Sequence, residues 1–184
     1  MRRIIVLLSI CLFAAPAFAQ WSDKEGHDLP ADTARARSGD FSGMLLVTPD
    51  ADWKQKWDTP PDTTPNFRST DTVAVGDKVT VLTFFSGPSA DAAGLVNIRC
   101  DLRVLRPDGS VSTDVKDVEC YHGKLQGVVT NVYLAAPSIE VLAEPGDQRG
   151  LWRVEITLRD VVAGVTMPLS TQVTLTNAVT PRSE

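Results

Sequence analysis

Asn97 to Cys120, NIRCDLRVLRPDGSVSTDVKDVEC, is the stretch that decides the fold. From Ile98 to Val104, apolar residues and Cys100 alternate with charged residues, which is the period-two pattern of a strand with one buried face. The segment that follows, Arg106 to Gly109, contains the proline, aspartate and glycine of a tight turn. The alternation then resumes, so this stretch predicts a β-hairpin.

The register of this hairpin bears on its two cysteines. If the strands pair directly across the turn, Cys100 lies opposite Val115, and Cys120 lies about 17 Å further along an extended strand. A disulfide requires Cα atoms within about 7 Å of each other. Either no bond forms between the two cysteines, or the chain leaves the strand near Lys116. We favour the second interpretation, because exported cysteines are usually paired, and we expect Asp117 to Gly123 to be an ordered loop crossing one end of the domain.

The N-terminus has the pattern of a secretory signal peptide. A pair of arginines precedes an apolar run from Ile4 to Phe13, and Ala17-Phe18-Ala19 is a cleavage site. We therefore expect residues 1–19 to be removed and the mature chain to begin at Gln20. The apolar run is shorter than the roughly 20 residues that span a bilayer, so the prediction is a periplasmic or secreted protein without a membrane anchor.

Removing 19 of the 184 residues would leave 165, with 16 basic and 23 acidic side chains and a net charge of −7. An acidic surface argues against nucleic acid and anionic membranes as partners. The length suits one domain with a full core. The two cysteines that remain indicate a disulfide rather than a metal or redox site.

The mature chain divides into three parts. Residues 20–40 are polar and have no sustained period, so we expect a flexible leader, with a short helix over 30–37 as the alternative. Residues 41–176 contain the strand patterns and are expected to form one β-sandwich domain. Residues 177–184 are expected to be a flexible tail.

Strand patterns recur through the domain. Lys78 to Phe85 is apolar on both faces and is expected to be a central strand. Trp152 to Leu158 and Val165 to Leu175 alternate strictly and predict a second hairpin. Pro168 in the last strand favours an edge position, because proline cannot donate to a ladder. Four further strands are expected: Phe41–Thr48, Val73–Val75, Val128–Leu134 and Ile139–Leu142.

About seven to nine antiparallel strands with little helix describe an all-β sandwich. Two runs resemble the strand patterns of bacterial immunoglobulin-like or fibronectin-III-like modules: Val73 to Val81, VAVGDKVTV, and Pro145 to Asp160, PGDQRGLWRVEITLRD. The resemblance covers roughly Thr72 to Thr176 and implies an immunoglobulin-like sandwich, but its motifs concern packing and turns rather than chemistry. The cysteines are closer in sequence than those of the inter-sheet bridge in antibody domains. The whole chain also resembles small periplasmic proteins of proteobacteria.

A segment rich in aromatic residues and proline follows the first expected strand. Asp50 or Asp52 can cap a short helix that places Trp53 and Trp57 on one face. The prolines that follow exclude a central strand and favour a course over the surface. Two interpretations stay open: exposed tryptophans anchor a partner, or both indoles cap one open end of the sandwich. The candidate partner surface comprises Trp53, Trp57, Pro60, Pro61 and Phe67.

Residues that could carry catalytic or metal chemistry are few. His27 is assigned to the leader and His122 to the surface, rather than to a metal site. No motif of a serine hydrolase, zinc protease, phosphate-binding loop or dinucleotide site is present. We therefore expect no catalytic, cofactor-binding or metal-binding residues, no cofactor and no enzymatic activity. Two acidic pairs are interpreted as turn and cap residues rather than as calcium or glycosidase carboxylates: Asp50/Asp52 and Asp114/Asp117.

These patterns predict an exported, non-catalytic module that holds a protein partner through its loops or an edge strand. A narrower alternative is an inhibitor or immunity-type protein for an exported toxin or hydrolase, because an acidic chain suits a basic partner. A hydrolase and a metal carrier are the remaining alternatives.

Overall fold

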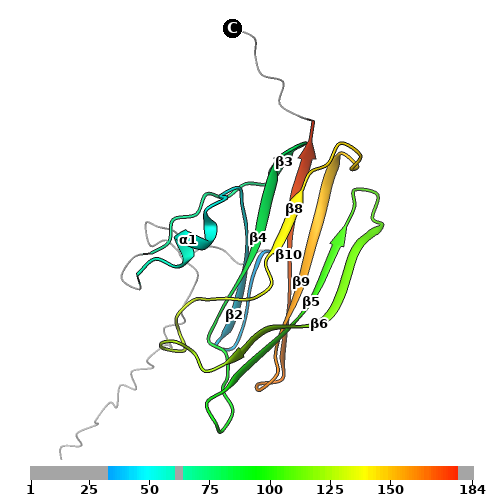
Figure 1. Ribbon diagram of the computed structural model, residues 1–184. Coiled ribbons are helices and arrows are strands. Elements are labelled where there is room, and N and C mark those ends of the chain that lie inside the picture. Colours follow the sequence, from blue (N-terminus) through cyan, green and yellow to red (C-terminus); the bar gives the residue numbers. More distant parts are fainter. Residues whose placement is uncertain (1–32, 61–63, 178–184) are drawn as a thin grey trace, which may run out of the picture.

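The computed structural model describes residues 33–60 and 64–177, which form two β-sheets packed face to face (Figure 1). The first sheet contains β1 (Arg35–Ser38), β2 (Phe41–Thr48), β4 (Lys78–Ser86), β7 (Tyr133–Leu134) and β8 (Ile139–Leu142). The second sheet contains, in spatial order, β3 (Thr72–Ala74), β10 (Val165–Thr176), β9 (Gly150–Asp160), β5 (Val96–Leu105) and β6 (Val111–Gly123). The short helix α1 (Trp53–Trp57) lies beside the first sheet.

The predicted all-β sandwich is confirmed as a fold class. The described residues contain ten strands rather than seven to nine. One pairing also differs from the expected antiparallel arrangement, because β3 runs parallel to β10. Parallel pairing is available here since the two strands are far apart in sequence and no hairpin connects them.

β4 is the central strand of the first sheet, with β2 on one side and β7 and β8 on the other. Every residue from Val79 to Ser86 is buried. Val81 and Phe85 belong to the main core between the sheets, whereas Leu82 and Phe84 belong to a second cluster with Trp53 of α1. Both faces of the strand are therefore covered, as its uninterrupted apolar sequence predicts.

β5 and β6 form the predicted hairpin, and a disulfide joins Cys100 to Cys120 with their Cα atoms 5.8 Å apart. The expected departure of the chain from the strand is wrong, because Asp117 to Gly123 continues as β6. Three register shifts place extra residues on β6. Two of them lie between the turn and Cys100, which is opposite Val118, and the third leaves Cys120 in a bulge between Glu119 and Tyr121. Bulges bend a strand, and β6 bends toward the first sheet in its second half (Figure 1).

Pro168 lies in the part of β10 that does not pair with β3, which agrees with the edge position that its sequence context predicts. β3 pairs only with the last three residues of β10, and among the described residues no other strand of that sheet pairs with this edge. The Ser170 N–H donates to the Thr33 carbonyl, away from β9, and Pro168 two residues earlier has the same orientation. Its missing N–H therefore leaves no gap in the ladder with β9.

The N-terminal part of the domain begins earlier than expected. Arg35–Ser38 pairs with β2 as strand β1, so a flexible or helical segment is the wrong prediction for these residues. Ala36 packs against the core, which a single small residue between arginines did not signal. The predicted signal peptide, the leader up to residue 32 and the tail from residue 178 lie outside the described residues. Within the described part of the chain, no helix is both long and apolar enough to cross a membrane.

Candidate functional site

A groove of about 260 Å³ opens between the two sheets on the side where β8 and β6 are the edge strands. Val104 of β5, Val141 of β8 and Trp152 of β9 are among the apolar side chains that line it. Its acidic lining residues are Glu140, Glu144 and Asp147, and the part of the chain that the structure describes contributes no lysine or arginine to the lining. The groove thus has a largely apolar lining, and Glu140, Glu144 and Asp147 form its acidic rim.

Trp152 is held in place at this groove by polar contacts at its edges. The alternation of β9 directs its side chain inward, and its indole Nε1 donates to the Gln148 carbonyl at 2.9 Å. The guanidinium of Arg106 lies 6.0 Å from the ring centroid, within the range of a cation–π contact. The indole is therefore a fixed wall of the groove, with 9 % of its surface exposed.

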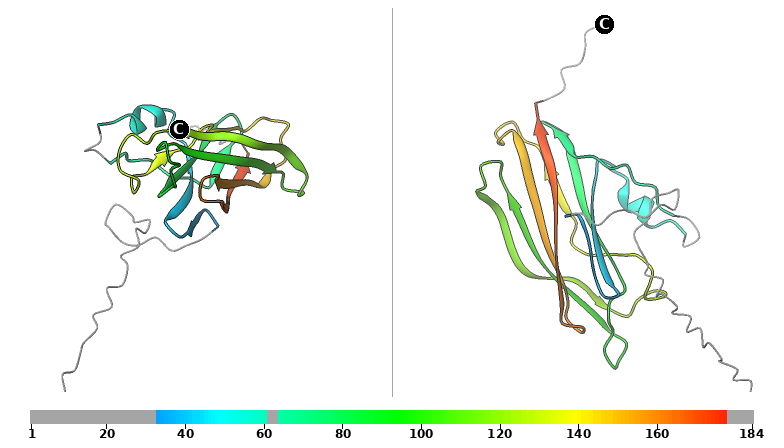
Figure 2. Two further views of the ribbon diagram at one scale, coloured as in Figure 1. Left: turned by 90° about the horizontal axis from the view of Figure 1, so that it is seen from below. Right: turned by 180° about the vertical axis from the view of Figure 1, so that it is seen from behind.

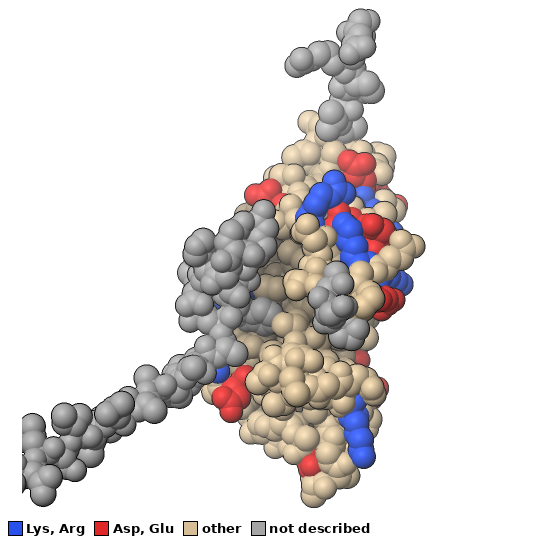
Figure 3. Space-filling view, turned by 90° about the vertical axis from the view of Figure 1, so that its left-hand side faces the viewer, with Lys and Arg blue, Asp and Glu red and all other residues tan. Residues whose placement is uncertain are grey.

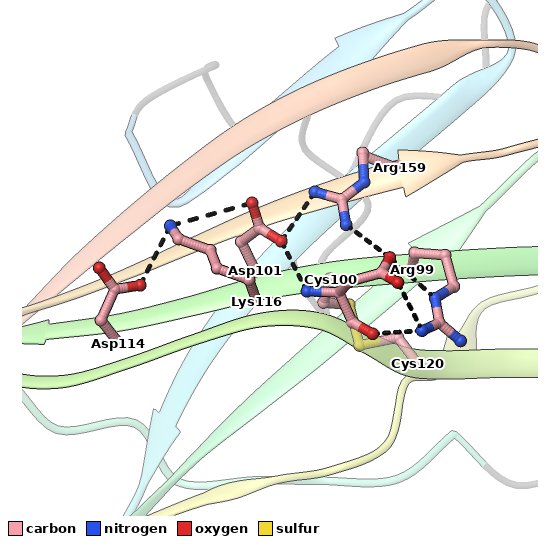
Figure 4. Close-up of polar contacts among 8 residues, drawn as sticks. Arg99, Cys100, Asp101, Asp114, Lys116, Cys120 and Arg159 are labelled. Carbon is pink, nitrogen blue, oxygen red and sulfur yellow. Dashed lines mark hydrogen bonds and ion pairs between the residues drawn. A yellow bond between two sulfur atoms is a disulfide. The ribbon is translucent and has the colours of Figure 1, made fainter.

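The bend of β6 is held by an ion-pair network on the outer face of the second sheet (Figure 4). Asp117 has a φ of 55°, a left-handed conformation that aspartate tolerates. Its backbone N–H donates to Asp101 Oδ1 at 2.9 Å, and its carboxylate accepts from Arg99 and Arg159. Arg159 Nη1 also lies 2.8 Å from Asp101 Oδ1. Three strands, β5, β6 and β9, thus fix the bulge that sets the direction of β6.

Asp101→Asn is expected to lower the free energy of unfolding by about 1 kcal/mol, because Arg159 loses a partly buried ionic acceptor. The N–H of Asp117, and next Arg159, lower the pKa of Asp101. A lowered pKa adds stability above the unfolded value of about 3.8, and acidification through the folded pKa removes it. Urea unfolding at pH 7 and pH 3 measures both effects. Glu140→Gln, which breaks an exposed pair with Lys78, is the control; equal losses in both variants would contradict the assignment.

A second polar site lies at the start of the segment that carries α1. The Asp50 carboxylate is fully buried and accepts from Lys56 Nζ at 2.6 Å, from Arg68 Nε at 2.6 Å and from the Arg68 N–H at 2.9 Å. Neither Asp50 nor Asp52 caps the helix with its side chain, so that prediction is wrong. Asp50 instead joins both ends of the segment from residue 50 to residue 68.

The tryptophans of the predicted partner surface lie over the outer face of the first sheet, not at an open end of the sandwich. Trp53 is only 8 % exposed and packs with Leu82 and Phe84 of β4. The Trp57 ring is half-buried, with its centroid 5.3 Å from that of Phe84. Figures 1 and 2 place α1 on the side of the molecule opposite the β5–β6 hairpin.

The other members of that predicted surface divide between packing and exposure. Phe67 is half-buried, with its ring centroid 6.2 Å from that of Phe84. Pro60 is exposed, and Pro61 lies outside the described residues. Among the described members of this cluster, Pro60 and the partly exposed rings of Trp57 and Phe67 are therefore the ones that offer area to a partner.

A further apolar surface is formed by Val128, Val129 and Val132, which are 63 %, 47 % and 43 % exposed. The sequence predicted a strand here, but only Tyr133–Leu134 pairs with β4. Residues 128–131 form a turn that is closed by a hydrogen bond from the Asn131 N–H to the Val128 carbonyl.

Figure 3 shows the side of the molecule that carries α1. Charged side chains gather in its upper part, and the visible lower surface is mostly uncharged.

Those of the residues considered for metal or catalytic chemistry that the structure describes do not form one cluster. His122 is exposed on β6, and His27 lies outside the described residues. Asp114 pairs with Lys116 at 3.1 Å, and Asp52 lies 3.5 Å from Lys56. Within residues 33–60 and 64–177, no group of three or more histidine, cysteine, aspartate or glutamate side chains could hold a metal ion.

Comparison with known proteins shows similarity at the level of structure only. No family model matches the sequence, and no curated protein is significantly similar to it. One similar structure is a family 123 glycoside hydrolase from Clostridium perfringens, with a TM-score of 0.45 and 8 % identity, over 77 % of this chain and 28 % of that one. Another is the CARDB domain of a Pyrococcus furiosus protein in complex with di-metal ions, with a TM-score of 0.36 and 11 % identity, over 80 % of this chain and 100 % of that one.

The first of these similarities contradicts the expectation that the protein is not an enzyme, and we do not retain that expectation. This chain spans about a quarter of the hydrolase, and the TM-score is below 0.5. The similarity therefore carries no argument for a particular activity.

Proposed function

We propose that this protein is an exported binding or accessory module of immunoglobulin-like topology that holds a protein partner in the groove between β8 and β6. The groove itself carries the proposal, because an apolar slot that is open to solvent at two strand edges suits an extended protein segment. Its location in an oxidising compartment is supported by the Cys100–Cys120 bond and by the signal-like N-terminal sequence.

The immunoglobulin-like topology is supported by two facing sheets and by the two strand patterns that resemble such modules. The disulfide lies within the second sheet, between neighbouring strands β5 and β6, rather than between the sheets. The module therefore differs from antibody domains in how its core is cross-linked.

A narrower form of the proposal is an inhibitor or immunity-type protein for an exported toxin or hydrolase. The acidic rim formed by Glu140, Glu144 and Asp147 favours this form, because it suits a basic partner. A captured partner whose own activity falls when the module binds would support inhibition, whereas undiminished activity would support the accessory role.

The proposal is tested by expressing the full chain in a Gram-negative bacterium and fractionating the cells. We expect mature protein in the periplasm, an N-terminus at Gln20, no free thiol in the denatured and unreduced protein, and one partner at a fixed stoichiometry after affinity purification. Cytoplasmic protein with Ala19 still attached, or periplasmic protein that is recovered without any partner, would contradict it.

A further inference from the structure

The first sheet ends at β8 with an unpaired edge. Among the strands in residues 33–60 and 64–177, β8 pairs with β4 alone. The Ala143 N–H donates to Asp77 and the Ala143 carbonyl accepts from Gly76, so the backbone of Ala143 faces the β4 side. Because strand residues alternate in direction, Glu140 and Leu142 direct their N–H and carbonyl groups toward the free edge. These two residues also line the groove.

The inner face of β6 opposite this edge is uncovered. Val115 pairs with Leu102 of β5 and shares its inward orientation, yet Val115 is 45 % exposed and Leu102 only 7 %. In β9, the next strand inward, Val154 and Ile156 are at most 1 % exposed. The exposed fraction of the inward side chains thus rises from β9 through β5 to β6. The first sheet therefore does not extend over β6 on this side and is narrower than the second sheet.

From this difference in width we infer that the groove is a vacant strand position, and that an extended segment of a partner protein fills it by adding to the edge of β8. The inference rests on the proposed binding function and specifies its partner. The added strand would hydrogen-bond to Glu140 and Leu142 and cover Val104 and Val115 with every second side chain. Since β8 is four residues long, the segment needs about four to six residues in extended form.

The charges at the groove define the other side chains of this segment. Glu140 lies on the outer face of β8, where the alternate residues of an added strand would be its neighbours. Glu140 also pairs with Lys78 of β4 at 3.1 Å, so the charge at this end comes mainly from Glu144 and Asp147. Among the described residues, no lysine or arginine lines the groove itself. The segment is therefore expected to alternate apolar residues with lysine or arginine.

A second copy of this chain fits the position less well. Two β8 strands that paired in an antiparallel manner would bring their Glu140 side chains close together, and like charges at such positions repel. The edge of β6 has bulges and carries Lys116 and Glu119, features that oppose edge pairing. The flanking sequences at 20–32 and 178–184 do not alternate apolar and basic residues.

The test uses the ¹⁵N-labelled mature chain and three capped hexapeptides, VKVKVK, VEVEVE and VVVKKK. We expect VKVKVK to shift the amide signals of Glu140, Leu142 and Val115 in a saturable manner, with affinity at least about tenfold above that of the acidic and the non-alternating peptide. Absence of saturable shifts with VKVKVK at millimolar concentration, shifts confined to other regions, or equal binding of all three peptides would overturn the inference.

Two variants of one residue separate edge pairing from side-chain contact. Leu142→Pro removes an N–H that faces the free edge, whereas Leu142→Ala keeps it; the leucine side chain itself is 54 % exposed. Both variants should unfold at the wild-type temperature within a few degrees, and only the proline variant should lose VKVKVK binding. Equal binding by both variants, or self-association that Leu142→Pro abolishes, would overturn the inference. A periplasmic partner that Leu142→Pro still retains would overturn strand addition to β8, while the groove would stay available to the proposed function through side-chain contacts.

Discussion

Replacing both Cys100 and Cys120 with alanine is expected to lower the free energy of unfolding by about 3 kcal/mol. The cysteines are 20 positions apart, and in the chain-entropy account a cross-link that closes a loop of this size restricts the unfolded chain by about that amount. Both side chains are at most 3 % exposed, so the alanines also leave small gaps in the core. For a domain of this size the melting temperature should fall by about 10 °C, measured by calorimetry.

The control is the wild-type protein unfolded in the presence of reductant, which should match the double alanine variant to within about 1 kcal/mol. Thiol titration of denatured, unreduced wild-type protein should find neither cysteine free. Two free thiols in that titration, or a double variant as stable as the wild type, would contradict the role given to this bond. The bond joins β5 to the second half of β6, so its loss should also release the bend that brings Tyr121 against Phe85.

Asp50→Asn is expected to cost about 3 kcal/mol at neutral pH, because a buried carboxylate with two cationic partners becomes a neutral amide. The amide presents a donor where the carboxylate accepted from Lys56 and Arg68, so at least one charged group loses its acceptor. Asp52→Asn is the matched control, since Asp52 is 54 % exposed and its pair with Lys56 should contribute less than about 1 kcal/mol.

The pH dependence gives a second measurement of the same group. Burial raises the pKa of Asp50, but the hydrogen bonds from Lys56 and Arg68 outweigh burial and hold it well below the ordinary value of 3.8. The contribution of Asp50 is therefore complete above about pH 4 and is lost as the pH falls toward the folded pKa. The free energy of unfolding of Asp50→Asn should decline less steeply than that of the wild type between pH 4 and pH 2. Parallel declines would contradict this assignment.

Local sequence predicted the elements that depend on short-range pattern. The alternation in β5, β9 and β10 and the doubly apolar pattern of β4 each record which faces are buried, and burial is what forms and orients a strand. Pro168 indicated an edge for an equally local reason, because proline has no backbone N–H to donate to a neighbouring strand. β1 was missed because Ala36, its inward residue, is too small to produce an apolar signal.

The candidate site could be predicted only in part. The segment Trp53 to Phe67 was singled out for its aromatic residues, yet contact with Leu82 and Phe84 turns most of it into a small core. Asp50 gave a cap signal that was wrong, because its partner Arg68 is 18 residues away. The groove gave no signal at all, since Val104, Val141 and Trp152 come from strands that are distant in sequence.

The sequence by itself determined the class of this protein: an all-β sandwich, closed by one disulfide, with central and edge strands assigned by periodicity and by proline. Tertiary structure alone decided the course of β6 and the width of the first sheet. Periodicity indicates whether a face of a strand is buried. It does not indicate where a bulge lies, because contacts from other strands fix the extra residue. In β6 these are the contacts of Asp117 with Arg99, Asp101 and Arg159. A vacant strand position likewise arises from the different widths of two facing sheets, so the sequence of a single strand does not indicate it.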